Sequence, residues 1–316
     1  MAQGQLAWLH LARQDYPGAT RHLEIGLPWA GKIQPDSRRA GTEAQLLTLS
    51  GMVSRLNCQL DEARVTLTAV LARGETLGKP RVQLGALDNL AYPASALGQW
   101  DEWASWGARY RALAHAIGSR LDVARGQLHL ALAAQALGDP ATAIRWHEQS
   151  LVIFRATGDR RMAAVALRYS GGLHLELGNL QAASQCCAQA QTLHQTLDET
   201  IEACRLDAQL ALCECHLGQP EAALSTVNAL LDRLASDLAD NPAHETLDMR
   251  WTCQQVLEIL DDARATAMLE QLYADVHARA AELTDGADRD RLIQALPVFR
   301  GIVAAQRRHG GPTATH

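Results

Sequence analysis

The amino-acid sequence predicts an all-α fold in which antiparallel helix pairs stack into a solenoid. Three observations support this prediction. Alanine, leucine, glutamine and arginine, which all favour helices, dominate the composition. No segment alternates apolar and polar residues with a period of two, so we expect no β-sheet. A 40-residue period runs through the middle of the chain, as is typical of stacked helical repeats.

The clearest marker of the repeat is a Leu-Gly dipeptide followed by a polar residue. Its copies are Leu97-Gly98-Gln99, Leu137-Gly138-Asp139, Leu177-Gly178-Asn179 and Leu217-Gly218-Gln219. A glycine directly after an apolar helical segment can take the left-handed conformation that ends a helix. Two positions after the glycine stand Trp100, Pro140, Leu180 and Pro220. Five positions after it stand Trp103, Ala143, Ala183 and Ala223. We therefore predict a tight turn between two helices, with the small alanines facing the preceding helix.

A second marker has the same period and predicts the link between one helix pair and the next. It consists of Gly78, Gly118 and Gly158, with Asp198 in the fourth place. Each unit then reads as a helix A of about four turns, a tight turn, a helix B of similar length and a short link.

The pattern extends outward with less fidelity. Residues 60–63 lie 40 positions before 100–103, and residues 260–263 lie 40 positions after 220–223, so both predict the start of a helix B. At the front, residues 15–19 predict one more turn and helix B, offset by an insertion.

We assign that insertion to residues 31–41, a loop-like stretch (GKIQPDSRRAG). About seven helix pairs result, the first with a short helix A, and they fill residues 1–285. Residues 262–284 predict a longer helix, and residues 286–308 predict capping helices with a break or a new start at Pro297. We expect residues 309–316 to be a disordered tail.

Composition and charge exclude several classes of function. A net charge of −6 and a pI near 6.0 argue against a nucleic-acid binder, which needs a dense basic face. No apolar run approaches the roughly 20 residues of a membrane helix, and the N-terminus lacks the layout of a signal peptide. Seven cysteines, an odd number, make a poor disulfide framework and favour reduced thiols in a cytoplasmic protein. They are Cys58, Cys186, Cys187, Cys204, Cys213, Cys215 and Cys253.

The helix-pair pattern resembles the tetratricopeptide (TPR) repeat, whose helix A carries Leu-x-x-(Leu/Ser)-(Gly/Ala) and whose helix B opens with a small alanine. The clearest match is Leu167-x-x-Ser170-Gly171-x-x-His174…Gly178…Ala183. Related matches are Leu47-x-x-Ser50-Gly51…Ala63 and Leu87-x-x-Leu90-Ala91…Gly98. The resemblance implies a right-handed superhelix, here with 40-residue units instead of the usual 34 or so. Trp103 replaces the family's small residue, so we expect that helix pair to be splayed or shifted.

Residues 251–305 contain the runs Leu257-Glu258-Ile259-Leu260-Asp261, Arg289-x-x-Leu292 and Leu296-Pro297-x-x-Arg300-x-Ile302. These runs resemble the closing segment of a narrower group, the C-terminal TPR regions of bacterial signalling ATPases, LuxR-type regulators and cyclase-associated ATPases. The phosphate-binding motif G-x-x-x-x-G-K-(S/T) does not occur in the sequence, nor do we place a helix-turn-helix or cyclase segment. The chain is then either a stand-alone repeat protein or the arm of a larger one.

Clusters of reactive residues favour structural roles over chemistry. Cys213 and Cys215 point about 200° apart on a helix, so with His216 they make a poor metal site, and we predict no metal or other cofactor. No nucleophile sits in a glycine-flanked elbow, and we predict no enzymatic activity. Trp100, Trp103 and Trp106 share one helix face, for which packing is favoured over a partner-binding anchor. One of these rings could still reach a contact between copies in a homo-oligomer.

In a TPR superhelix the helix A residues line the concave groove, and the resemblance implies a set of groove residues here. They are Asp88, Asn89, Tyr92, Arg125, His129, Gln135, Arg168, Tyr169, Glu176, Arg205, Gln209 and His216. Arg125, Arg168 and Arg205 come from three successive repeats and could bind acidic groups or a C-terminal carboxylate, or be ordinary solvated side chains. The paired Lys and Asn of the family's carboxylate clamp are not matched.

The function predicted from these observations is that of a non-catalytic module that binds a protein or peptide in its groove, as a scaffold or regulatory arm. The alternative is a small-ligand sensor arm of a larger bacterial signalling ATPase or transcriptional regulator.

Overall fold

The computed structural model describes residues 2–12, 16–33, 36–56, 60–236, 238, 243–281 and 286–309. All regular secondary structure in these segments is helical. The chain forms two compact units, Met1–Leu137 and Gly138–His316, which we describe one at a time.

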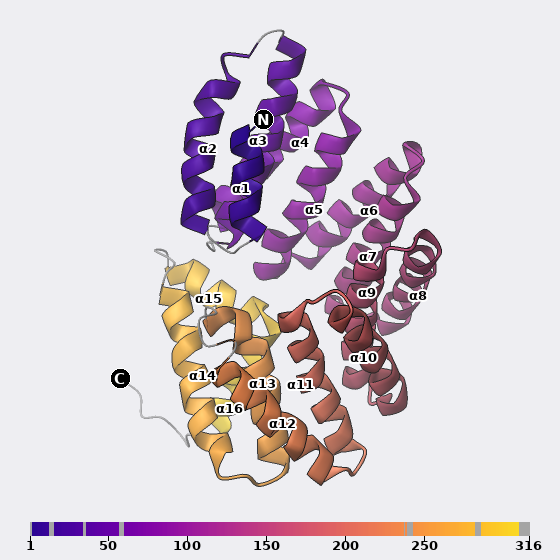
Figure 1. Ribbon diagram of the computed structural model, residues 1–316, viewed down its shortest axis with the longest axis vertical. Coiled ribbons are helices and arrows are strands. Elements are labelled where there is room, and N and C mark those ends of the chain that lie inside the picture. Colours follow the sequence, from indigo (N-terminus) through magenta and orange to yellow (C-terminus); the bar gives the residue numbers. More distant parts are fainter. Residues whose placement is uncertain are drawn as a thin grey trace. The chain divides into compact units, whose positions relative to one another are not determined.

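The first unit is a row of helices in which each packs against the next along the chain (Figure 1). Its helices are α1 (Ala2–Ala12), α2 (Tyr16–Ala30), α3 (Asp36–Leu56), α4 (Leu60–Thr76), α5 (Pro80–Ala96), α6 (Trp100–Ala116) and α7 (Arg120–Ala136). Helix α3 also packs on both α1 and α5. The A helices α1, α3 and α5 therefore lie side by side.

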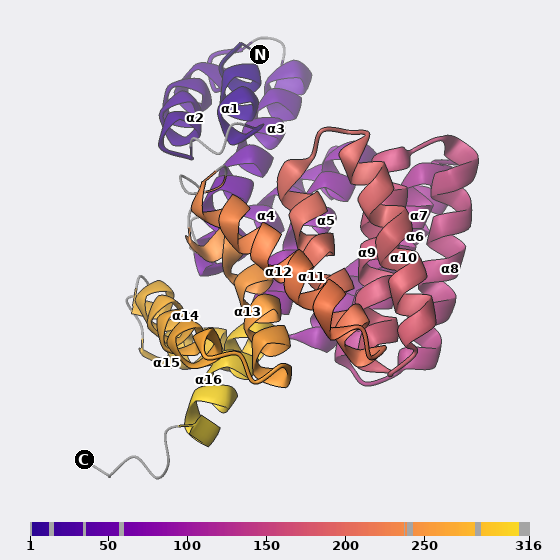
Figure 2. The same cartoon turned by 60° about the horizontal axis from the view of Figure 1, so that its bottom comes forward.

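The second unit continues the same pattern (Figure 2). Its helices are α8 (Pro140–Thr157), α9 (Arg160–Glu176), α10 (Leu180–Gln195), α11 (Thr200–His216), α12 (Pro220–Ala235), α13 (Ala243–Ile259), α14 (Arg264–Ala281), α15 (Gly286–Ala295) and α16 (Pro297–His309). Helix α11 packs on both α9 and α13, while α16 packs on α13, α14 and α15. The predicted all-α architecture of consecutive helix pairs is confirmed within each unit.

The glycines that mark the repeat all end helices in the left-handed conformation. Their φ angles lie between +57° at Gly78 and +78° at Gly138. After Gly98, the N–H of Gln99 donates to the carbonyl of Ala94 at 2.8 Å and satisfies one of the last carbonyls of α5. Asp198 takes the same conformation without being a glycine, with φ +56°.

Asp198→Gly is therefore expected to raise the free energy of unfolding by about 1 kcal/mol, because an L side chain is strained at positive φ. Urea denaturation followed by circular dichroism measures the change. Asp159→Gly is the control, because Asp159 has φ −77° and caps α9 through the N–H of Met162 at 3.0 Å. That substitution should not stabilise the protein, and equal gains in both variants would contradict the strain argument.

The predicted loop over residues 31–41 is wrong in its second half. Helix α3 begins at Asp36, so only residues 31–35 separate α2 from α3, and residues 34 and 35 lie outside the described part of the chain. Apart from Gly41, residues 36–41 contain nothing that opposes a helix, and the space beside Gly41 is open.

The last predicted turn lies three residues further along the chain than the 40-residue period places it. Helix α13 begins 43 residues after α11, at 243 instead of 240, so the extra residues lie in the link after α12. Asp261, with φ +52°, ends α13 as Gly218 ends α11 and lies three residues late, whereas α14 begins at Arg264 instead of 260, four residues late.

Trp103 does not shift the register of its helix pair. The B helices α4, α6, α8, α10 and α12 begin at residues 60, 100, 140, 180 and 220, so the period passes unchanged through α6. Trp103 is half-buried beside Trp100, with ring centroids 6.1 Å apart. The pair therefore keeps the sequence period, and the expectation that its helices are splayed or shifted in their packing stays a prediction.

The C-terminal segment follows the alternative in which Pro297 starts a new helix. Helix α15 ends at Ala295, and Pro297 is the first residue of α16, where the missing N–H costs nothing. His309, predicted to begin the tail, is the last residue of α16, and its Nε2 lies 2.9 Å from Glu258 Oε1. Residues 310–316 lie outside the described residues, and the capping role of α15 and α16 stays a prediction.

Candidate functional site

A cleft of about 970 Å³ lies over the A helices of the first unit, lined by α1, α3 and α5. Its middle is apolar and includes Trp8, Leu9, Leu49 and Met52. Trp8 and Leu9 are 54% and 52% exposed. Exposed aromatic and aliphatic side chains in a concave site are typical anchors for a binding partner.

The local sequence explains why these side chains stay outside the core. Ala7 is fully buried and turns its face of α1 toward α2 and α3, where it packs with Ala19 and Leu46. Trp8 and Leu9, the next two residues, then point to other sides of the helix, each about 100° further round. The packing of α1 therefore leaves both side chains in the cleft.

The two ends of the cleft are polar and differ in charge. Arg81 lies at the end where α5 begins, together with Thr42 and Gln45. Asp88 and Asn89 lie two turns further along α5. The amide of Asn89 donates to the carbonyl of Gly85 at 2.8 Å, which fixes the orientation of its side chain.

Hydrogen bonds and one ion pair hold the charged groups of the cleft in place. Asp88 Oδ1 lies 2.8 Å from Nε2 of His129, whose Nδ1 is 3.4 Å from the indole nitrogen of Trp103. Arg81 pairs with the buried Asp122, which also accepts a hydrogen bond from the Tyr110 hydroxyl at 3.1 Å. Burial, reinforced by nearby Asp88 and Asp122, raises the pKa of Tyr110, so its hydroxyl stays protonated and donates.

The predicted arginines of the second unit are bound to carboxylates of the chain itself. Arg168 Nε lies 3.3 Å from Glu202, and its guanidinium lies 4.2 Å from the ring centre of Tyr169. Arg205 pairs with Glu202 and, at 2.9 Å, with Asp248. Helices α9, α11 and α13 are thus joined by a network of two cations and two anions, and a ligand carboxylate would have to compete with Glu202 or Asp248.

The fold has clear counterparts among solved structures. A Rap protein complexed with Competence and Sporulation Factor superposes with a TM-score of 0.69 at 12% identity, covering 88% of this chain and 74% of that one. BtubC from P. vanneervenii gives 0.59 at 18%, covering 73% and 93%. NprR in complex with its cognate peptide NprX gives 0.60 at 12%, covering 95% and 85%. These are TPR-like repeat proteins. The chain has a TPR-like fold. No family model and no curated protein matches the sequence.

The other residues predicted to line the groove of this TPR-like chain differ in burial and in their hydrogen-bond partners. Arg125 belongs to the first unit and is partly buried, with a buried Nε that has no hydrogen-bond partner. In the second unit, Gln209 Oε1 accepts from the Cys187 thiol at 3.5 Å. The other predicted residues lie in the last two turns of A helices and are half-buried or exposed: Tyr92, Gln135, Glu176 and His216.

Sequence reasoning missed the α1 and α3 side of the cleft because the Leu-Gly marker begins at α5. A signal was nevertheless present in α1. Leu6, Ala7, Trp8 and Leu9 place apolar groups all around the helix, more than a single buried stripe can use.

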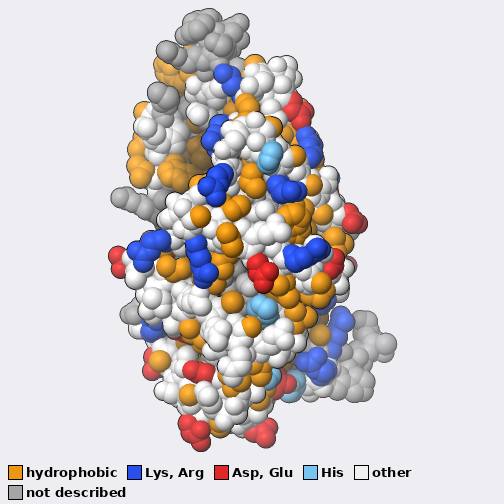
Figure 3. All heavy atoms as spheres, turned by 90° about the vertical axis from the view of Figure 1, so that its right-hand side faces the viewer, with side chains coloured by type: hydrophobic (Ala, Val, Ile, Leu, Met, Phe, Trp, Pro, Cys, Tyr) orange, Lys and Arg blue, Asp and Glu red, His pale blue; other side chains and the backbone are white. Residues whose placement is uncertain are grey.

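The cysteines that the structure describes are free thiols, while Cys58 lies outside the described residues. Among described residues no three His, Cys, Asp or Glu side chains gather as metal ligands would. Trp100, Trp103 and Trp106 are all half-buried. None of the described helices is both long and apolar enough to span a membrane. On the face drawn in Figure 3, basic side chains are interspersed with acidic and hydrophobic ones instead of forming a continuous stripe.

Proposed function

We propose that this chain is a non-catalytic module that binds a peptide, free or as a segment of another protein, in the cleft over α1, α3 and α5. The observation that supports this proposal is the 970 Å³ cleft with exposed Trp8 and Leu9 between polar ends. A site of this volume, apolar in the middle with a few fixed polar groups, is suited to ligand binding. The proposal is also supported by the TPR-like structures that were solved with a bound factor or cognate peptide.

The cleft favours a ligand with apolar side chains and an acidic group toward one end. Apolar side chains would pack against Trp8 and Met52, while Gln45 and Asn89 would bond the peptide backbone. Arg81 is 72% exposed, so its guanidinium can bind a ligand carboxylate while it remains paired with Asp122.

The predicted groove residues of the second unit remain in this proposal as a secondary contact. There Arg168 and Arg205 would bind an acidic side chain of the partner by exchange with Glu202 or Asp248. Exchange of one carboxylate for another gains less than binding to an unpaired arginine, so we place the main anchor in the cleft.

Filling the cleft tests the proposal directly. Short peptides selected from a random phage-displayed library on the wild-type chain should bind Gly85→Leu at least about tenfold more weakly, because the new side chain occupies the cleft. The nearest atom to a Cβ at Gly85 is Thr48 Cγ2 at 3.7 Å, so the helix accepts the substitution. Gly85→Ala is the matched control and should bind the peptides as the wild type does.

Two tryptophan variants distinguish peptide binding in the cleft from peptide binding to any exposed apolar side chain. Trp8→Ala should reduce binding of the same peptides by about tenfold or more, as loss of an aromatic anchor does. Trp29 on α2 is 65% exposed, stacks with Lys32 and does not line the cleft, so Trp29→Ala should leave binding unchanged. Peptides that bind Gly85→Leu and Trp8→Ala as well as the wild type would refute the proposal.

A further inference from the structure

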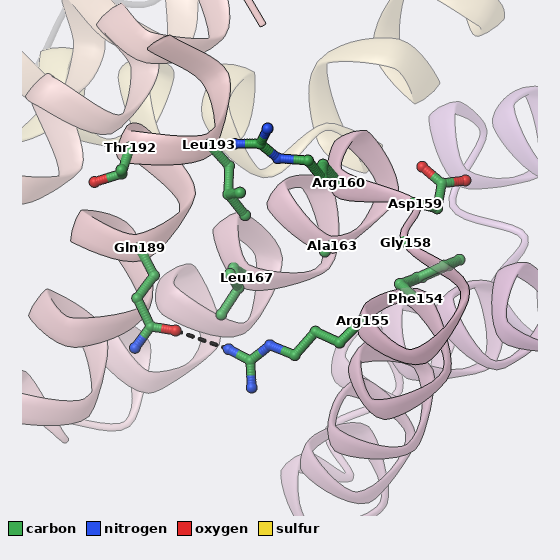
Figure 4. Close-up of a pocket in the computed structure, with 10 residues that line it drawn as sticks. All are labelled: Phe154, Arg155, Gly158, Asp159, Arg160, Ala163, Leu167, Gln189, Thr192 and Leu193. Atoms are coloured by element: carbon green, nitrogen blue, oxygen red, sulfur yellow. Dashed lines mark hydrogen bonds between the residues drawn. The ribbon is translucent and has the colours of Figure 1, made fainter. Parts of the chain in front are cut away.

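A separate cleft of about 420 Å³ lies within the second unit, where the end of α8, the start of α9 and the last turns of α10 meet (Figure 4). Its floor is apolar and consists of Phe154, Ala163, Leu167 and Leu193. The first three of these are almost completely buried, so the floor is a fixed part of the core. A rigid apolar surface of this kind can cover the middle of a small organic molecule.

Two arginines lie at opposite sides of this floor (Figure 4). Arg155 comes from the last turn of α8, and its Nη2 donates to the Gln189 side-chain oxygen at 2.8 Å. Arg160 is the first residue of α9, and its Nη2 donates to the Thr196 hydroxyl at 2.9 Å. Both partners are neutral, and none of the ion pairs found among the described residues includes Arg155 or Arg160.

The repeat supplies an internal comparison for Arg155. Two periods earlier, the positions of Arg155 and Gln189 are occupied by Glu75 and Arg109, which form an ion pair at 2.5 Å. The same helix-to-helix contact is therefore charge-balanced between α4 and α6, and carries an uncompensated positive charge between α8 and α10. A polar contact alone does not require that charge, because a neutral donor would bond Gln189 equally well.

Asp159 is the one acidic residue that lines the cleft, and it does not neutralise the arginines. Its carboxylate caps α9 by accepting from the N–H of Met162 at 3.0 Å. In Figure 4 it points away from both guanidinium groups. The cleft thus presents a cation, an apolar surface and a second cation in that order.

We propose that this cleft binds an elongated organic dianion with an apolar middle, of the chemical class of the aliphatic dicarboxylates. One carboxylate pairs with Arg155 and the other with Arg160, while the chain between them covers Leu167 and Leu193. Each guanidinium has further N–H groups besides the one that its neutral partner accepts, so the ligand need not break either existing bond. This site shares no residue with the peptide cleft of the first unit, and either proposal can fail without the other.

Calorimetric titration with octanedioate, octanoate and 1,8-octanediol tests the charge pattern. Octanedioate should bind about tenfold or more tightly than octanoate, because each charge-assisted pair adds affinity, and the diol should give no measurable binding. Arg155→Gln and Arg160→Gln should each reduce the affinity for octanedioate by about tenfold. Thr192→Trp should also abolish binding, since Thr192 lines the cleft and its hydroxyl bonds only within its own helix in the structure.

Arg145→Gln is the matched control, because Arg145 is an exposed arginine of α8 that lies outside the cleft and bonds Thr142 at 2.8 Å. It should leave the affinity for octanedioate unchanged, and circular dichroism should show the same helicity in all variants. The proposal is overturned if octanedioate does not bind, or if the diol or octanoate binds as tightly as octanedioate. It is equally overturned if the Arg145→Gln control weakens binding as much as the two cleft variants do.

Discussion

Gly126→Ala is expected to lower the free energy of unfolding of the first unit by about 2 kcal/mol or more, although alanine is the better helix former. A Cβ at Gly126 would lie 2.7 Å from Cβ and 2.8 Å from Cα of Arg111. The main chain of α6 fixes the positions of both atoms, so they cannot move aside as the end of a flexible side chain can. Helices α6 and α7 must therefore separate, and the packing between them is lost.

Gly85→Ala is the matched control for this prediction. Gly85 also lies inside a helix, but its nearest neighbour would be Thr48 Cγ2 at 3.7 Å, an ordinary contact. The substitution should raise stability by about 1 kcal/mol, the usual gain from Gly to Ala in a helix. Urea denaturation of both variants measures the difference, and a rise in stability for Gly126→Ala would show that the close approach of α6 and α7 is not required.

The sequence predicted the repeat well because its markers act locally. A residue that must take positive φ is favoured as glycine by its own backbone, whatever packs around it, so Gly98 and Gly138 could be read directly. Gly126 could not be read in this way. It lies in a regular helix, and the need for it arises only from how closely Arg111 on the neighbouring helix approaches.

The departure from the 40-residue period after α12 could not be read from the sequence either. Nothing in the pattern around residues 260–263 opposes a helix B start there, since Asp261 and Asp262 are good first-turn residues. The three additional residues lie upstream, between Ala235 and Ala243, and extra chain length between two helices costs little free energy. A fixed period cannot detect such an insertion unless a further copy of the Leu-Gly marker follows it, and here Asp261 stands in the place of that glycine.

The candidate site was predicted only in part for a related reason. Asp88 and Asn89 do line a cleft, because their place on an A helix follows from the period. The partners of the arginines depend on tertiary contacts. Glu202 lies three residues before Arg205 on one helix and could have been foreseen, whereas Asp248 comes from α13, which the insertion displaces.

His147 makes the stability of the second unit depend on pH. Its side chain is only 2% exposed, and neither ring nitrogen has a hydrogen-bond partner. Burial, helped by the nearby His174, lowers the pKa of His147 from 6.5 to about 4. The folded protein therefore holds this ring neutral at a pH where the unfolded chain would already bind a proton.

The direction in which pH changes the stability follows from the lower pKa of His147 in the folded state. Well above pH 6.5 the ring is neutral in both states, and its titration contributes nothing to the pH dependence. As the pH falls below 6.5 only the unfolded state takes up the proton, so stability falls until the folded ring titrates near pH 4. One group gives a slope of about 1.4 kcal/mol per pH unit, and the total loss is about 3 kcal/mol.

His147→Leu should remove this slope and leave the pH dependence of all other groups in place. The difference in unfolding free energy between variant and wild type, measured by urea denaturation from pH 7 to pH 4, should therefore grow by about 3 kcal/mol toward acid. His115→Leu is the control, because His115 lies on an exposed face of α6 and should give no such growth. If the difference for His147→Leu stays constant with pH, the ring must gain a polar partner in solution that holds its pKa near the ordinary value.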